Sequence, residues 1–312
     1  MSGSDADRSG NALRSLLRKS HHLPADRLGT VVAEHARMLG AREAVVYLAD
    51  YEQHALIPVP GEGVPDRSPL TIDDSLGGRA FRQVDVVPSP AHEGASGLWV
   101  PLLDGAERNG VLEMVYDRPT SGADEQGART FASLIAELSV TRDAYSDVFA
   151  RLRRSRPMTV AAEMQWDLLP PLTFATDRIV ITGVLEPCYE IGGDTFDYAV
   201  NGSTTDLLIL DAVGHGLPAA LLSSAAVGAY RHGRRQQLDL PDICALVNEV
   251  VAHQFAGSQF ATAIIARLDL DTGQLRWVNA GHPQPLLLRD GALVQHTPCR
   301  PHRPLGLQTD KP

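Results

Sequence analysis

Apolar residues in the first 120 positions are spaced as in a helix followed by strands. From Leu28 to Leu39 they recur at helical intervals and stop at Gly40, a residue that commonly caps a helix C-terminus. Continuous apolar runs then predict three strands, at Ala44–Leu48, Gly97–Leu103 and Val111–Tyr116. The intervening stretch, 58–96, is rich in Pro, Gly and Asp, which predicts loops around a short helix.

A second helical pattern joins the two halves of the chain. Apolar positions from Phe131 to Leu152 predict a long helix that leaves the first half and could pair with a second copy. A further helix, Val160–Leu169, should end at Pro170-Pro171, because proline cannot continue it. The basic run Arg151–Arg156 could contact nucleic acid or membrane, but a solvated helix face is the favoured interpretation.

The C-terminal half opens with a hairpin pattern that brings two aspartates together. Alternation after Asp194, the turn signal Asn201-Gly202 and the apolar run ending at Asp211 predict two antiparallel strands. A turn centred after Gly202 places Asp194 opposite Asp211. Like charges directly opposite are destabilising, and aspartate oxygens suit a hard cation such as Mg²⁺ or Mn²⁺. The alternative is that both aspartates merely flank turns, where Asp is common.

Helices and further strands follow this hairpin. Pro218 marks the start of an Ala- and Leu-rich helix to Arg231, and a second helix is expected over Pro241–Gln254. Four later strands are predicted, at Phe260–Leu268, Gln274–Val278, Pro285–Arg289 and Ala292–Gln295. Helices between runs of antiparallel strands predict an α+β sandwich rather than an alternating parallel sheet.

Composition excludes several classes of protein. The 312 residues suffice for two domains, and the net charge of −10 argues against a general nucleic-acid binder. Three distant cysteines, Cys188, Cys244 and Cys299, form neither a disulfide framework nor a zinc cluster, which indicates a reducing compartment. With neither a membrane-spanning run nor a signal-peptide pattern in the sequence, we expect a cytoplasmic protein.

The layout of the first half resembles a GAF-type sensory domain: helix, strand, irregular middle, closing hairpin and long final helix. GAF domains often hold a small ligand under the irregular middle, although no residue here identifies one. We expect four segments: 1–19 as a flexible tail, 20–145 as a GAF-like domain, 146–170 as a helical connector that transmits a signal, and 171–312 as a second domain.

Motifs of the second half are similar to those of SpoIIE-type members of the PPM (protein phosphatase 2C-like) metal-dependent phosphatases. The resemblance is carried, in order, by Gly192–Asp197, Asp211–Gly216, Phe260–Ala263 and Asn279–Pro283, after a preceding segment Gln165–Pro170. It implies a four-layer αββα sandwich holding two Mn²⁺ or Mg²⁺ ions that activate a water for phosphoester hydrolysis.

The same resemblance assigns roles to single residues. Asp194 and Asp211 would bind metal through their carboxylates, and Ala212 through its backbone carbonyl; Gly193, Asp197 and His215 would support the site. His282 lies in a turn between strands, where a structural role is expected.

One part of the family pattern is missing. After Arg303–Leu307 the family continues to an Asp-Gly pair and an Asp-Asp pair that complete the metal site, whereas this sequence ends at Pro312, and Asp310 cannot replace them. The second domain is therefore expected to be incomplete, either as a fragment or as a shortened relative.

Two functions follow. The first is a sensor-regulated, homodimeric protein serine/threonine phosphatase whose substrate is a phosphorylated anti-anti-sigma (STAS) regulator. The second is a non-catalytic sensory or docking protein that binds phosphoprotein without hydrolysing it.

Overall fold

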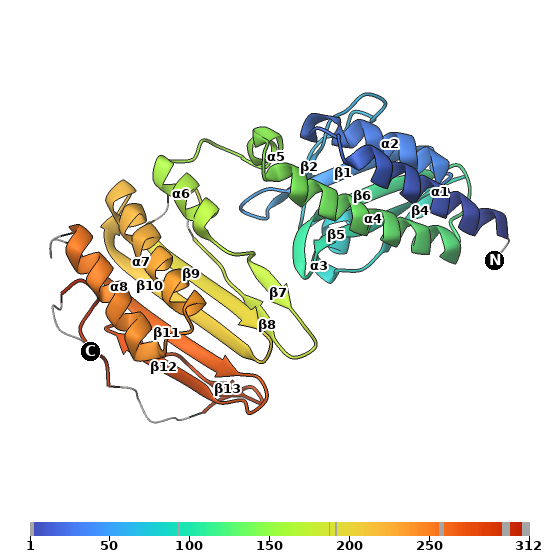
Figure 1. Ribbon diagram of the computed structural model, residues 1–312. Helices are drawn as coiled ribbons and strands as arrows, with labels where there is room; N and C mark the ends of the chain where they lie inside the picture. The colour runs from blue at the N-terminus through green and yellow to red at the C-terminus, as the bar shows by residue number, and fades with distance from the viewer. Residues whose placement is uncertain are drawn as a thin grey trace. The chain divides into compact units, whose positions relative to one another are not determined.

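The computed structural model describes residues 3–92, 94–186, 188–190, 192–255, 259–294 and 300–307. The chain divides into two compact units, Met1–Ser155 and Arg156–Pro312 (Figure 1). Ile191 of the hairpin motif, the strand end at Gln295, Cys299 and the segment 308–312 with Asp310 lie outside the described residues. Among the described helices, none is long and apolar enough to cross a membrane.

The first unit is built on a six-stranded antiparallel sheet of order β3-β2-β1-β6-β5-β4. Its strands are β1 (Glu43–Ala49), β2 (Ala55–Pro58), β3 (Leu70–Thr71), β4 (Val87–His92), β5 (Ala95–Asp104) and β6 (Glu107–Tyr116). Its helices are α1 (Gly3–Ser20), α2 (Leu28–Met38), α3 (Leu76–Gln83), α4 (Gly122–Asp143) and α5 (Asp147–Leu152), with a 3-10 turn at Ala25–Arg27. The helix α2, the strands β1, β5 and β6, the short helix α3 and the start of α4 were predicted from the sequence, whereas β2, β3 and β4 lie in or beside the stretch 58–96 that was predicted as loops.

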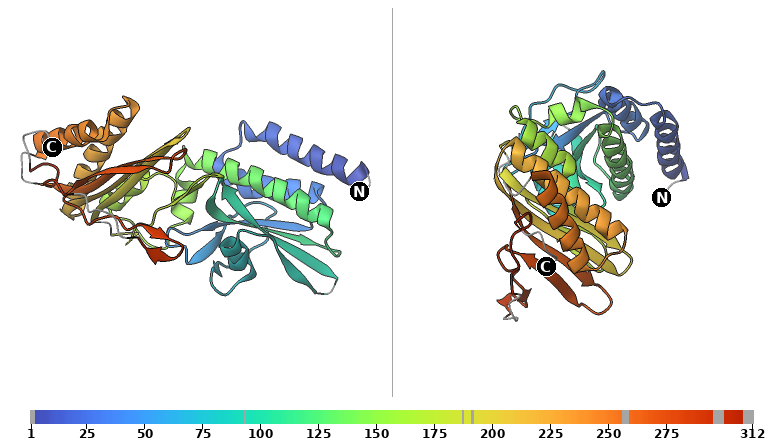
Figure 2. Two further views of the ribbon diagram at one scale, coloured as in Figure 1. Left: turned by 90° about the horizontal axis from the view of Figure 1, so that it is seen from below. Right: turned by 60° about the vertical axis from the view of Figure 1, so that its left-hand side comes forward.

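Both faces of this sheet are buried, because side chains alternate along β1. Val46 and Leu48 pack into one apolar cluster with α1, α2 and α4, whereas Val45 and Tyr47 pack into another with α3. Figure 2 shows the first set of helices on one side of the sheet.

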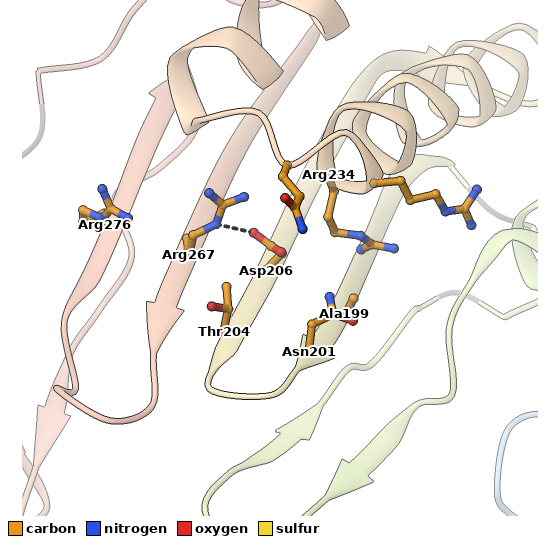
Figure 3. Close-up of a pocket in the computed structure, with 9 residues that line it drawn as sticks. Ala199, Asn201, Thr204, Asp206, Arg234, Arg267 and Arg276 are labelled. Atoms are coloured by element: carbon orange, nitrogen blue, oxygen red, sulfur yellow. Dashed lines mark hydrogen bonds and ion pairs between the residues drawn. The ribbon is translucent and has the colours of Figure 1, made fainter.

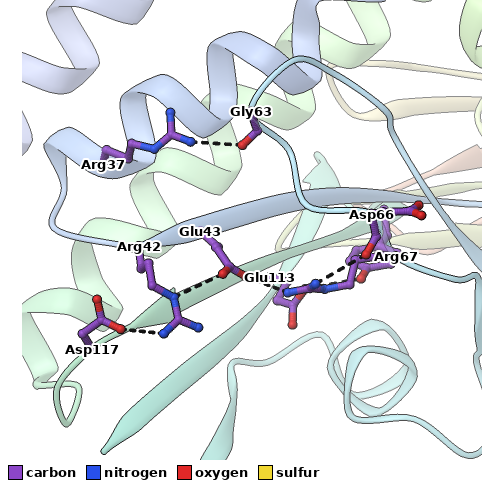
Figure 4. Close-up of polar contacts among 9 residues, drawn as sticks. Arg37, Arg42, Glu43, Gly63, Asp66, Arg67, Glu113 and Asp117 are labelled. Atoms are coloured by element: carbon purple, nitrogen blue, oxygen red, sulfur yellow. Dashed lines mark hydrogen bonds and ion pairs between the residues drawn. The ribbon is translucent and has the colours of Figure 1, made fainter.

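Charged groups join the irregular middle of this unit to the α3 side of the sheet (Figure 4). Arg67 contacts Glu43 at 2.7 Å and Glu113 at 3.4 Å, and the Tyr47 hydroxyl donates to Glu113 at 3.3 Å. Burial raises the pKa of Glu113, and the Arg67 guanidinium opposes that rise. An ion-pair network therefore ties the irregular middle to β1 and β6.

Two predictions for the first half need correction. The tail expected to be flexible over 1–19 is helical from Gly3, because Ala12 and Leu16 on one face of α1 are buried in the core of the unit. The long helix expected from Phe131 to Leu152 is interrupted after Asp143, and α5 restarts at Ser146, whose side chain caps it. The side chain of Ser146 therefore starts a new helix at a position where the apolar spacing alone predicts a continuous one.

Arg153, in the basic run Arg151–Arg156, packs against the first unit. Arg153 Nε donates to the carbonyl of Ala49 at 2.8 Å, and its guanidinium lies 4.7 Å from the centre of the Tyr51 ring. The boundary between the two units falls between residues 155 and 156 of the chain. The predicted connector 146–170 is therefore divided: α5 lies in the first unit, and α6 (Val160–Leu168) lies in the second.

The second unit is built on a four-stranded antiparallel sheet of order β12-β11-β10-β9, covered on one face by α7 and α8 (Figure 1). The strands are β9 (Gly192–Asn201), β10 (Thr204–His215), β11 (Ala261–Asp269) and β12 (Leu275–Ala280). The helices are α7 (Leu217–Arg235) and α8 (Leu240–Phe255), which bury apolar side chains against β10 and β11. Two small hairpins complete the described part: β7 (Thr173–Ala175) with β8 (Val180–Thr182), and β13 (Leu288–Arg289) with β14 (Ala292–Leu293).

The fold class is α+β, as predicted. Of the expected αββα sandwich, the described residues form one helical layer and one main sheet.

The start of α4 yields a prediction about pH and stability. Asp124 and Ser121 form a capping box, and Arg118 contacts both carboxylate oxygens of Asp124 at 2.7 Å. The Arg118 guanidinium, followed by Ser121, holds the pKa of Asp124 well below its ordinary value. The charged Asp124 side chain therefore stabilises the fold fully above the pKa that Asp124 has in the unfolded state. This stabilisation is lost as pH falls towards the lower pKa of Asp124 in the folded state.

We expect Asp124→Asn to cost about 1 kcal/mol of unfolding free energy at neutral pH, and less at about pH 3. Urea denaturation at both pH values measures the difference. Asp117→Asn is the matched control, since Asp117 is 66% exposed in its ion pair with Arg42 and should contribute little. Equal losses in the two variants would show that the capping box carries no special stability.

Candidate metal centre

The β9–β10 hairpin places Asp194 directly opposite Asp211, which confirms the predicted register. Pairing runs from Asn201 and Thr204 at the turn to this aspartate pair, and Gly202 adopts a φ of 62°, a value suited to glycine. Both carboxylates project from the sheet face opposite the helices. The turn at Gly202 therefore sets the strand register that brings the two acidic residues together, although they lie eight and nine residues away from it in the sequence.

The two carboxylates interact unfavourably when both are charged. Burial, then the charge of Asp211 and a hydrogen bond with its side chain, raise the pKa of Asp194. A proton or a cation between the two carboxylates would relieve this conflict.

His282 reaches the same site from the turn after β12. Its Nδ1 lies 2.8 Å from the Thr262 hydroxyl, while the Asn279 side chain donates to the His282 carbonyl and accepts from its N–H, both at 2.8 Å. His282 also lowers the pKa of Asp194, against the larger effects that raise it. These bonds hold the turn, and His282 lines the same pocket as Asp194, a proximity between distant strands that the sequence did not reveal.

Gly193 allows the close approach of the two strands. A Cβ at this position would lie 2.1 Å from the carbonyl oxygen of Ala212, closer than any real contact. The backbone is also fixed from the helix side: the buried Ser223 hydroxyl donates to the Gly193 carbonyl at 2.7 Å, and Gln165 Nε2 donates to the Asp194 carbonyl at 3.1 Å. Neither Ser223 nor Gln165 was singled out as a site residue from the sequence.

Asp197 does not support the site as expected. It lies three residues after Asp194, so strand alternation turns it to the opposite face, where it is buried and ion-paired with Arg231 at 2.7 Å and Arg234 at 2.9 Å. His215 ends β10 opposite Gly192, beyond an irregularity in the pairing, and is exposed.

The donors present fit a hard cation in part. Two carboxylates face each other, and the carbonyl of Ala212 lies in the tight approach of β10 to Gly193. Within the part of the chain that the structure describes, no three His, Cys, Asp or Glu side chains are grouped to hold a metal ion. A cavity of about 480 Å³ lies beside Asp194 on the sheet face away from α7 and α8, between this face and residues 181–185; His282, Phe196 and Ile209 also line it.

Comparison with known proteins identifies the second unit. The family model for stage II sporulation protein E (SpoIIE) matches residues 201–312. This match covers Asp211 and the strands and helices that follow it. The matched SpoIIE segment includes Asp211, while Asp194 precedes it and joins the site through strand pairing.

Two relatives from Bacillus subtilis (strain 168) are similar to this chain. Phosphoserine phosphatase RsbP is 24% identical over 51% of this chain and 40% of its own length. Phosphoserine phosphatase RsbU is 25% identical over 39% of this chain and 37% of its own length. The chain thus spans about two fifths of these relatives.

Among solved structures, one similar to this chain is the GAF domain from an Acinetobacter phosphoenolpyruvate-protein phosphotransferase. The match covers 47% of this chain and 98% of the chain of that GAF domain. It is 18% identical, with a TM-score of 0.37.

Substitution of Gly193 tests the close approach of β9 and β10. Gly193→Ala should lower the free energy of unfolding by about 1–3 kcal/mol, because the added methyl group meets backbone atoms that cannot move aside. Gly192→Ala is the matched control, since a Cβ there meets nothing within 4 Å. Chemical denaturation of both variants gives the comparison, and equal stabilities would contradict the proposed crowding.

Removal of one charge tests the aspartate pair. Because the pKa of Asp194 is raised in the folded state, the metal-free protein loses stability as pH rises above the ordinary carboxyl value. Asp194→Asn should therefore raise the melting temperature slightly in a chelator at neutral pH, and it should abolish the stabilisation that Mn²⁺ gives the parent protein. Asp177→Asn, an exposed change in the same unit, should alter neither quantity. A full Mn²⁺ effect in Asp194→Asn would exclude this carboxylate as a ligand.

Proposed function

We propose that this chain is a metal-dependent protein serine/threonine phosphatase. The observation that carries the proposal is the register pair Asp194–Asp211 on the sheet face away from α7 and α8, where Asp211 lies in the segment that matches the SpoIIE model. The relatives RsbP and RsbU, both phosphoserine phosphatases by name, support the same reaction class.

In this proposal the hairpin supplies the metal ligands. The carboxylates of Asp194 and Asp211 and the carbonyl of Ala212 would hold Mn²⁺ or Mg²⁺. When bound, two such ions acidify a water molecule and neutralise charge on the phosphoryl group during in-line displacement. No covalent bond between substrate and protein is needed.

The surrounding residues would position this centre and its substrate. Ser223 and Gln165 fix the backbone of β9, so that Asp194 keeps its place against Asp211. Thr262 and Asn279 orient His282, whose imidazole lines the adjoining cavity. The apolar floor of that cavity would accept side chains next to a phosphorylated residue.

Substrate and regulation rest on family resemblance. A phosphorylated anti-anti-sigma (STAS) protein in a bacterial cytoplasm fits the reaction class, and the GAF-like first unit would control the reaction through α5 and α6, in a homodimer. The second candidate function, phosphoprotein docking without turnover, is favoured by one observation: the described residues contribute two acidic side chains to the centre rather than three or more.

Hydrolysis of a phosphoserine peptide in the presence of Mn²⁺ tests the proposal. We expect Asp211→Asn to lower the rate roughly 100-fold or more, because several kcal/mol of charge stabilisation depend on the metal centre. Asp177→Asn should retain full activity. Parent-like activity in Asp211→Asn would contradict the metal centre, whereas peptide binding without turnover in the parent protein, with one weak Mn²⁺ site or none, would favour docking.

A further inference from the structure

A row of charged side chains crosses the far end of the second sheet from the metal centre. Arg276 on β12 pairs in register with Arg267 on β11, Arg267 with Asp206 on β10, and Asp206 with Ala199 on β9. Figure 3 shows Arg276, Arg267 and Asp206 following one another across neighbouring strands. Directly paired residues have Cβ atoms about 5 Å apart, so the row is continuous.

The helix layer ends at this row. One step further along each strand on the same face, Leu208, Ile265 and Val278 pack against α7 and α8. By contrast, α7 stops at Arg235 and α8 starts at Leu240, which leaves the charged row without a helix above it. A pocket of about 700 Å³ lies here, lined by four arginines, Asp206 and the hairpin residues Asn201 and Thr204, among others.

Two of the four arginines are held by buried carboxylates. Arg267 Nε donates to Asp206 at 2.7 Å and its Nη2 to the Leu238 carbonyl at 3.3 Å; Arg234 contacts Asp197 at 2.9 Å. The carboxylate side chains are only 6% and 2% exposed. These pairs fix guanidinium groups in the wall of the pocket before any ligand arrives.

The other two arginines, Arg235 and Arg276, are exposed and have no hydrogen-bond or ion-pair partner within the described ranges. They come from different elements, the end of α7 and the edge strand β12. Among the residues that the structure describes, Asp206 is the only acidic one that lines the pocket, in a protein whose net charge is −10. The pocket thus holds a local excess of positive charge that the fold itself does not neutralise.

We propose that this arginine pocket binds a diphosphate group. Guanidinium groups recognise phosphate through paired hydrogen bonds, and two unpaired groups on separate elements favour a ligand with more than one phosphate. Asn201 and Thr204 add neutral hydrogen-bonding groups at the hairpin. No aromatic ring lines the pocket among the described residues, so the diphosphate rather than an attached base is the recognised part.

This site is separate from the metal centre. Ala199 lies five residues along β9 from Asp194, about 16 Å in an extended strand. The arginine pocket also opens on the helix side of the sheet, whereas Asp194 and Asp211 lie on the other face. The proposal therefore stands whether or not the chain is a phosphatase.

Calorimetric titration of the full 312-residue chain with inorganic pyrophosphate, in a chelator and at constant ionic strength, tests the proposal. We expect saturable binding that the double variant Arg235→Ala/Arg276→Ala weakens about tenfold or more. The double variant Arg79→Ala/Arg289→Ala is the matched control, because it removes the same charge from exposed positions elsewhere and should bind as the parent does. Asp211→Asn should also bind normally, which separates this site from the metal centre.

Two further ligands identify what is recognised. Equal affinity for ADP and pyrophosphate would support recognition of the diphosphate alone, and tighter binding of ADP would identify a nucleotide as its source. Orthophosphate should bind at least about tenfold more weakly, since it reaches fewer guanidinium groups. Equal binding of orthophosphate, absence of saturable binding by either diphosphate, or equal loss in the control variant would each overturn the proposal.

Discussion

The pairing of β9 with β10 is the constraint on which the second unit depends. Asn201-Gly202 sets the turn, and each later pair follows from it up to Asp194 and Asp211. A slip of one residue would move every side chain of the moved strand to the other face, separating the two acidic groups and exposing Asp197. The apolar positions Leu208 and Leu210, buried beneath α7 and α8, oppose such a slip because they would lose their core contacts. Core packing and the acidic pair are thus specified by the same register.

The two faces of this hairpin handle negative charge differently. On the helix side, Asp197 and Asp206 are buried. Arginines of α7 neutralise Asp197, and Arg267 of β11 neutralises Asp206. A buried carboxylate without such a partner would be strongly destabilising. On the uncovered side, Asp194 and Asp211 face each other, and no arginine is paired with either in the described part. The contrast distinguishes carboxylates that hold the fold together from carboxylates that are available to a cation.

Sequence patterns predicted the features that depend on short-range chemistry. The register of Asp194 and Asp211 follows from one turn and an alternation of period two, and the helix after His215 follows from Pro218 at its first turn. Features formed between distant segments were missed, among them the bonds from Ser223 and Gln165 to β9. The helix α1 was missed for a related reason: its polar composition resembles a tail, and only the tertiary core that receives Leu16 makes it helical.

The acidic pair also separates stability from function. Two opposed carboxylates weaken the metal-free fold, and the raised pKa of Asp194 reflects that conflict. A sequence selected for stability alone would have a neutral residue at one of these two positions. Elsewhere in the same sheet, acidic side chains are neutralised, since Asp197 and Asp206 both have arginine partners. Unrelieved charge at one defined position, beside a glycine that admits no side chain, is a conflict that a bound cation would remove, which is the role proposed for this hairpin. The conflict follows from the strand register, whereas the matched family segment begins only at residue 201.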